Sequence, residues 1–148
     1  MKKSSLFSFV ALAAVVLASC SNPADLTRSG LKPADFESVY DGSQTCLHSL
    51  VNSSGMEVCI TNFGGRVVSV MVPDRDGAFR DVVLGFDKVS DYFPENNKTD
   101  FGASIGRYAN RINQGRFTLD GVEYQLPQNN FGHCLHGGPQ GWQYKVYD

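Results

Sequence analysis

Two stretches of the chain concentrate residues that could do chemistry. Residues 102–112 read Gly-Ala-Ser-Ile-Gly-Arg-Tyr-Ala-Asn-Arg-Ile, and residues 129–139 read Asn-Asn-Phe-Gly-His-Cys-Leu-His-Gly-Gly-Pro. Asn110 can donate and accept hydrogen bonds, Arg111 offers a rigid fork of donors, and a neutral His136 donates from one ring nitrogen and accepts at the other. Two interpretations stay open on residue types alone. The three side chains bind a polar ligand, or they are structural, with Arg111 on a carboxylate or on loop carbonyls and Asn110 capping a turn.

The remaining candidates for chemistry are weaker. The sequence contains neither a CxxC pair nor an HxxxH pair, so it predicts no zinc site, and no other metal or organic cofactor is indicated. His48 and His133 are expected at the surface or in turns. Trp142 and Phe131 could stack on a ligand, although packing is the more common use of aromatic side chains.

The elements that would position these residues are predicted to be strands. Short β-branched and aromatic runs alternate with turn signals from Gly55 onward, and no 3.6-residue apolar period extends beyond the N-terminal segment. An Asp120-Gly121 pair between alternating runs is the strongest short-range signal for a β-hairpin. The fold class expected is all-β, an antiparallel β-sandwich or barrel. The predicted strands cover residues 57–62, 66–72, 81–86, 115–119 and 122–126.

The N-terminus reads as an export signal. Two lysines are followed by a 13-residue apolar stretch, residues 6–18, which is short for a membrane span, and then by Leu17-Ala18-Ser19-Cys20. This tetrapeptide resembles a bacterial lipobox, which implies that residues 1–19 are removed and that Cys20 is acylated; an ordinary signal cleaved near Ala18 is the alternative. Residues 20–34 are polar and aperiodic, and we expect them to form a flexible tether to a domain over residues 35–148.

Removal of the signal changes the totals. The chain has 148 residues and a net charge of −2; without residues 1–19 and their two lysines, 129 residues remain, with 11 basic against 15 acidic side chains. This balance argues against a nucleic-acid partner and against a polybasic membrane-surface binder. Three cysteines remain besides Cys20, so at most one disulfide can form within the chain. We expect a lipid-anchored protein of a bacterial cell envelope, in the periplasm or on the outer membrane, of unknown oligomeric state.

The motifs together resemble the aldose 1-epimerase (galactose mutarotase) family. The resemblance covers about residues 55–142 and rests on these segments in this order: Thr-Asn-Phe-Gly-Gly-Arg at 61–66, Asp-Val-Val-Leu-Gly-Phe-Asp at 81–87, Gly-Arg-Tyr-Ala-Asn-Arg-Ile at 106–112, Phe-Thr-Leu-Asp-Gly-Val-Glu-Tyr-Gln-Leu-Pro at 117–127 and Leu-His-Gly-Gly at 135–138. It implies a galactose mutarotase-like supersandwich, incomplete in this chain, and an isomerase that interconverts the α and β anomers of hexoses such as galactose or glucose.

The resemblance also implies roles for single residues. Asn110, Arg111 and His136 match family residues that line the sugar site, with His136 positioning or polarising the substrate and Gly137 and Gly138 allowing close approach of the backbone. Mutarotation needs a base at the anomeric hydroxyl and an acid at the ring oxygen, and no cofactor. The family's acid histidine and base glutamate follow the Leu-His-Gly-Gly motif, and nothing in this sequence matches them. The chain is therefore expected to be truncated before its acid and base, and to be inactive alone.

Three other functions stay open. The chain could be a non-catalytic carbohydrate-binding lipoprotein, a fragment without function, or a related enzyme such as a hexose-phosphate epimerase. A hexose-phosphate epimerase would need several basic residues around the phosphate, and the stretch near Asn110 contains only Arg107 and Arg111.

Overall fold

The computed structural model describes residues 26–148, so the predicted signal peptide and Cys20 lie outside the described residues. Residues 26–148 form antiparallel strands and short 3₁₀ turns and contain no α-helix, which confirms the prediction of an all-β fold. None of the helical turns in this range is long and apolar enough to cross a membrane. The strands are β1 (Ser38–Tyr40), β2 (Ser43–Thr45), β3 (Leu47–Val51), β4 (Glu57–Thr61), β5 (Arg66–Pro73), β6 (Phe79–Asp81), β7 (Arg111–Ile112), β8 (Arg116–Leu119), β9 (Val122–Gln125) and β10 (Cys134–Leu135). The 3₁₀ turns are η1 (Pro33–Phe36), η2 (Val89–Tyr92), η3 (Asn113–Gly115), η4 (Gly138–Gln140) and η5 (Trp142–Tyr144).

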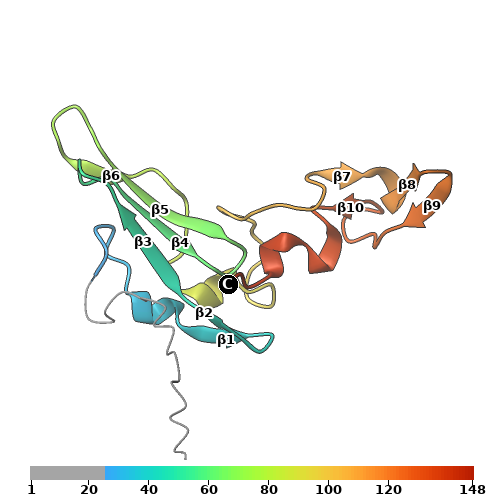
Figure 1. Cartoon of the computed structure of the whole chain (residues 1–148), viewed down its shortest axis with the longest axis horizontal. Helices are drawn as coiled ribbons and strands as arrows, with labels where there is room; N and C mark the ends of the chain where they lie inside the picture. Colours follow the sequence, from blue (N-terminus) through green and yellow to red (C-terminus); the bar gives the residue numbers. More distant parts are fainter. Residues whose placement is uncertain (1–25) are drawn as a thin grey trace, which may run out of the picture.

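The strands divide into two groups that lie at opposite ends of the molecule (Figure 1). The larger group is a four-stranded sheet in the order β3-β4-β5-β6, with the β1-β2 pair beside it. The other end carries two small antiparallel pairs, β7 with β10 and β8 with β9. Asn110, Arg111 and His136 all belong to this second end.

The predicted strands and hairpin are mostly confirmed. β4, β5 and the β8-β9 hairpin form where expected, and Asp120-Gly121 makes the two-residue connection, with both residues at positive φ. The strand predicted over residues 81–86 is wrong, because β6 ends at Asp81. The Asp81 carboxylate accepts hydrogen bonds from the backbone N–H groups of Val70 and Val83, at 3.0 Å each, and so closes the ladder at this point. Val82 and Leu84 are left 65% and 75% exposed instead of buried in a strand.

A β-bulge in β5 decides which of its residues face the core. Cys59 pairs with Ser69 and Ile60 pairs with Val67, so Val68 is the extra residue on the bulged strand. The bulge resets the two-residue alternation, and both Val68 and Ser69 are buried. Arg66, before the bulge, and Met71, after it, therefore both face the core. Arg66 is fully buried although it is the first residue of the strand.

The core lies between the four-stranded sheet and the 3₁₀ turns η1 and η2. The rings of Tyr40, Phe63 and Phe93 contact one another with centroids 4.8–5.0 Å apart. Tyr92 is fully buried, and its hydroxyl accepts a hydrogen bond from the Phe86 backbone N–H at 2.6 Å. Burial raises the pKa of Tyr92, because the charged phenolate would be poorly solvated there. The buried apolar cluster contains Leu31, Phe36, Leu47, Cys59, Phe63, Val68, Val89, Tyr92 and Phe93.

The described half of the predicted tether packs on the sheet. The Arg28 backbone N–H donates to the Glu57 carboxylate at 2.8 Å, and the Arg28 guanidinium lies 4.0 Å from the centre of the Phe79 ring. Leu31 and Pro33 are buried. The folded part of the chain thus extends N-terminally of residue 35, because apolar side chains among polar neighbours anchor this segment.

Arg66 joins the two ends of the molecule. Its side chain is fully buried and donates to three backbone carbonyls, those of Thr99 (3.3 Å), Phe101 (3.1 Å) and Gln143 (3.1 Å). The guanidinium also lies over the rings of Phe63 and Tyr92, at 5.5 and 5.2 Å from their centres. Burial lowers the pKa of Arg66. The segments that it holds lead directly into residues 102–106 and 134–142, which flank the candidate site.

Candidate functional site

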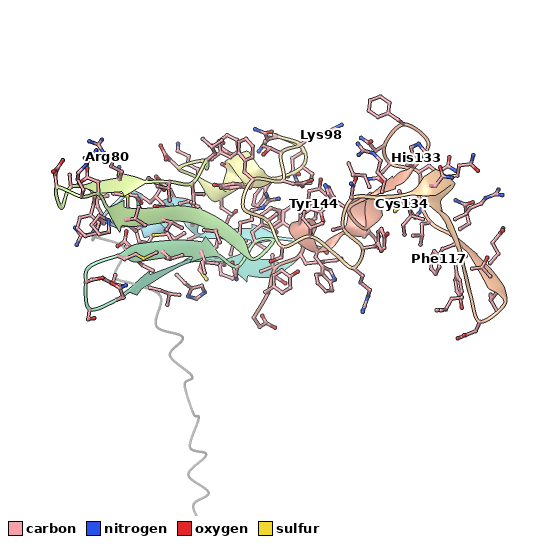
Figure 2. The ribbon with its side chains drawn as sticks, turned by 90° about the horizontal axis from the view of Figure 1, so that it is seen from above. Arg80, Lys98, Phe117, His133, Cys134 and Tyr144 are labelled. Atoms are coloured by element: carbon pink, nitrogen blue, oxygen red, sulfur yellow. The ribbon has the colours of Figure 1, made fainter. Side chains whose placement is uncertain are left out.

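β7 and β10 bring the predicted site residues together. Arg111 in β7 pairs with Leu135 in β10, so Asn110 and His136 lie next to each other at the ends of the two strands. Twenty-six residues separate Asn110 from His136 along the chain, and the β8-β9 hairpin lies between them. Figure 2 shows this end of the molecule with Phe117, His133 and Cys134 labelled.

Two hydrogen bonds lock Asn110 to His136. The His136 backbone N–H donates to the Asn110 carbonyl at 2.9 Å, and the Asn110 backbone N–H donates to His136 Nδ1 at 3.0 Å. A nitrogen that accepts carries no proton, so the neutral ring holds its proton on Nε2 and offers Nε2–H as a donor. Both residues have positive φ, 57° at Asn110 and 52° at His136, a conformation that side chains other than glycine adopt mostly where the surroundings impose it.

Two asparagine side chains hold Arg111. Arg111 Nε and Nη2 both donate to Asn130 Oδ1, at 3.0 and 2.8 Å, and Nη1 donates to Asn110 Oδ1 at 3.2 Å. Of the two structural roles considered for Arg111, a carboxylate partner and loop carbonyls, neither is found among residues 26–148, where the one ion pair joins Arg80 to Asp74. A guanidinium has five N–H donors, so one on each terminal nitrogen remains for a ligand.

The side chain of Arg111 borders a hollow of about 710 Å³ with a mainly apolar lining. Trp142 and Phe117 form part of its wall and are 42% and 38% exposed. The site therefore combines N–H donors from Arg111 with aromatic surface, which suits a ligand that has both hydroxyl groups and an apolar face. Phe131, the other aromatic residue considered for stacking, is 92% exposed and does not line the hollow.

Gly137 allows the backbone of another segment to approach closely. Its φ is +81°, and a Cβ placed on it would collide with the carbonyl oxygen of Gly106. Gly106 in turn leaves no room for a side chain beside Trp142. The close approach that the Leu-His-Gly-Gly motif allows is thus between two segments of the protein, and it sets the distance between residues 106 and 137 on either side of the site.

The other candidate residues lie outside this arrangement. His133 Nδ1 accepts from the Gln114 backbone N–H at 3.0 Å in a turn, and His48 Nε2 lies 3.2 Å from Cys46 Sγ in the distant sheet. Arg107 is the exception, because it is exposed and lines the same hollow as Arg111. Residues 26–148 contain no group of three or more His, Cys, Asp or Glu side chains that could hold a metal ion.

The profile of the aldose 1-epimerase family matches residues 47–148. The chain belongs to the aldose 1-epimerase family. It is 48% identical over 84 residues to a probable aldose 1-epimerase of Arthroderma benhamiae, covering 54% of this chain and 19% of that protein. It is 43% identical over 101 residues to bovine galactose mutarotase, covering 68% of this chain and 29% of the relative.

A solved structure confirms the fold. The crystal structure of an aldose epimerase homologue from C. elegans superposes with a TM-score of 0.66 and 33% identity, over 70% of this chain and 31% of that one. This aldose 1-epimerase family member thus spans less than a third of the length of each of these relatives. Its antiparallel sheets correspond to one part of a larger epimerase fold.

Two residues important for this arrangement were not singled out from the sequence. Asn130 holds the Arg111 guanidinium from 19 residues away, and the buried Arg66 joins the sheet to the site. The Asn129-Asn130 pair belongs to the stretch of residues 129–139, but no local pattern predicts which asparagine reaches Arg111. Arg66 was expected to begin a strand, and nothing in its neighbours showed that a bulge would bury it.

Proposed function

We propose that this protein interconverts the α and β anomers of a hexose such as galactose or glucose. We also propose that residues 26–148 supply the hydrogen-bond-donating part of its sugar site. The observation that carries the proposal is the convergence of Asn110, Arg111 and His136 on paired strands in a chain of the aldose 1-epimerase family.

The chemistry assigns these residues to binding and polarisation. The two unused Arg111 donors suit hydroxyl oxygens of the sugar, and His136 Nε2–H suits a ring or hydroxyl oxygen that gains negative charge as the ring opens. Ring opening also needs a base at the anomeric hydroxyl and an acid at the ring oxygen. Within the described residues no carboxylate contacts Arg111 or His136. We propose that the acid and base belong to polypeptide beyond the matched third of the fold.

The same observation favours a second candidate, a carbohydrate-binding lipoprotein without turnover. A site that donates hydrogen bonds but has no base would hold a sugar and leave its anomers unchanged. Both candidate proteins would bind a hexose, but only the first would accelerate the exchange of its anomers.

Polarimetry of freshly dissolved α-D-galactose tests the proposal. We expect no acceleration by the 148-residue chain, and acceleration when the chain is fused to the remainder of bovine galactose mutarotase. Arg111→Ala in the fusion is expected to lower kcat/KM at least about 100-fold, because it removes the charged donors of the site. Acceleration by the short chain alone would contradict the assignment of acid and base. A fusion that binds galactose without accelerating mutarotation would favour the second candidate.

We propose further that the protein is exported and anchored to the bacterial envelope through a lipid on Cys20. The support is the lipobox-like sequence, which lies outside the described residues. Cells fed labelled palmitate should label the wild-type protein and leave the Cys20→Ala variant unlabelled. Equal labelling of both proteins, or cleavage near Ala18 without label, would refute the anchor.

A further inference from the structure

We infer that Asn130 is a positioning residue of the sugar site, which fixes the Arg111 guanidinium and leaves its positive charge uncompensated. This inference rests on the proposed function. It assigns a role to a residue that contacts Arg111 and has no assigned contact with the sugar.

The geometry around Arg111 supports this role. Asn130 Oδ1 accepts from Nε at 3.0 Å and from Nη2 at 2.8 Å, so one oxygen holds one edge of the guanidinium plane. Asn110 Oδ1 holds Nη1 at 3.2 Å. With two terminal nitrogens and Nε fixed, the plane cannot rotate freely, and the two remaining N–H groups keep a defined direction.

The backbone around Asn130 makes it a firm support. Asn130 is half-buried and forms a two-way backbone bridge with His133, with N···O distances of 3.1 and 2.8 Å. The preceding Asn129 side chain binds both backbone groups of Leu135, at 3.1 and 2.8 Å. Since Leu135 pairs with Arg111, the loop that carries Asn130 is tied to the same two strands as the arginine.

The partner is an amide and not a carboxylate, and this has a consequence for binding. A carboxylate at position 130 would form a charge-compensated pair with Arg111 and could draw its remaining N–H groups into a fork-to-fork contact. An amide oxygen holds the same edge without cancelling the charge. The remaining donors then make charge-assisted hydrogen bonds to ligand oxygens, which are roughly twice as strong as neutral ones.

The substitution Asn130→Asp separates this role from a merely structural one. It preserves the accepting oxygen and adds only charge, so thermal stability should stay equal or rise, while the Kd for D-galactose rises about tenfold or more. Asn130→Ala should also weaken binding, because Arg111 loses its support. Gln44→Glu adds the same charge at an exposed position of the distant β1-β2 pair and should change neither property.

Binding can be followed by the fluorescence of Trp142, which is the only tryptophan and borders the same hollow as Arg111. The NMR signal of Arg111 Nε–H adds a readout that needs no sugar. In the wild type and in Asn130→Asp, the Arg111 Nε–H proton should exchange with water more slowly than the Nε–H proton of the exposed Arg107. In Asn130→Ala the two protons should exchange equally fast. Galactose affinity within twofold of wild type in Asn130→Asp, or unprotected Arg111 Nε–H in the wild type, would overturn the inference. Absence of galactose binding by the wild type, with Arg111 Nε–H protected, would instead contradict the proposed function.

Discussion

Arg66→Ala is expected to lower the free energy of unfolding by about 3–5 kcal/mol, a large part of the 5–15 kcal/mol typical of a domain, because it leaves buried carbonyls without a donor and opens a cavity. The side chain is fully buried and binds three backbone carbonyls in two segments that are distant from it in the sequence, Thr99 and Phe101 in one and Gln143 in the other. Removing it leaves Thr99, Phe101 and Gln143 without this donor and opens a cavity beside Phe63 and Tyr92. Urea or thermal denaturation followed by circular dichroism measures the loss.

Arg80→Ala is the matched control for this prediction. Arg80 has one ion pair, to Asp74 at 3.4 Å, and its side chain is 73% exposed. Solvent screens such a pair, so its loss should cost less than about 1 kcal/mol. If Arg66→Ala and Arg80→Ala destabilise the protein equally, Arg66 does not join the sheet to the site as described.

Gly137→Ala is expected to destabilise the protein by about 2–5 kcal/mol and to displace His136. Two effects add: left-handed backbone costs a residue with a Cβ about 1–2 kcal/mol, and overpacking costs about 1–3 kcal/mol more. The added methyl group would collide with the Gly106 carbonyl, which lies in a backbone segment and cannot rotate away. Denaturation curves and the NMR shift of the His136 amide report both effects.

Gly121→Ala separates the two contributions. Gly121 has nearly the same φ, +79°, but nothing lies within 4 Å of a Cβ placed there. Its substitution should therefore cost only the backbone part, about 1–2 kcal/mol. Equal losses at positions 121 and 137 would show that the contact between residues 106 and 137 carries no energy.

Local patterns predicted local structure well. The Asp120-Gly121 hairpin followed from turn chemistry, and β4 and β5 followed from β-branched runs, because both signals act within a few residues. The prediction of a strand over residues 81–86 ignored a side-chain contact, namely the Asp81 carboxylate that closes the ladder. The weakly patterned residues 34–54 gave no assignment and form η1 and three strands.

The site was less accessible to sequence reasoning. The expectation that Asn110, Arg111 and His136 act together came from family resemblance, and the structure brings them together through the pairing of β7 with β10. Asn130 and Arg66 act through contacts over 19 to 77 residues of sequence. No periodicity or short motif encodes contacts of that range, so their roles became visible only in three dimensions.

A titration of the ¹⁵N-labelled chain with D-galactose, followed by NMR, shows whether a sugar binds at β7 and β10. We expect saturable shifts concentrated at the backbone amides of Asn110 and His136, at Arg111 Nε–H and at the Trp142 indole, with β3–β6 unaffected and no response in Arg111→Ala. Absence of shifts up to the solubility limit of the sugar, or shifts confined to the four-stranded sheet, would contradict a sugar site at β7 and β10.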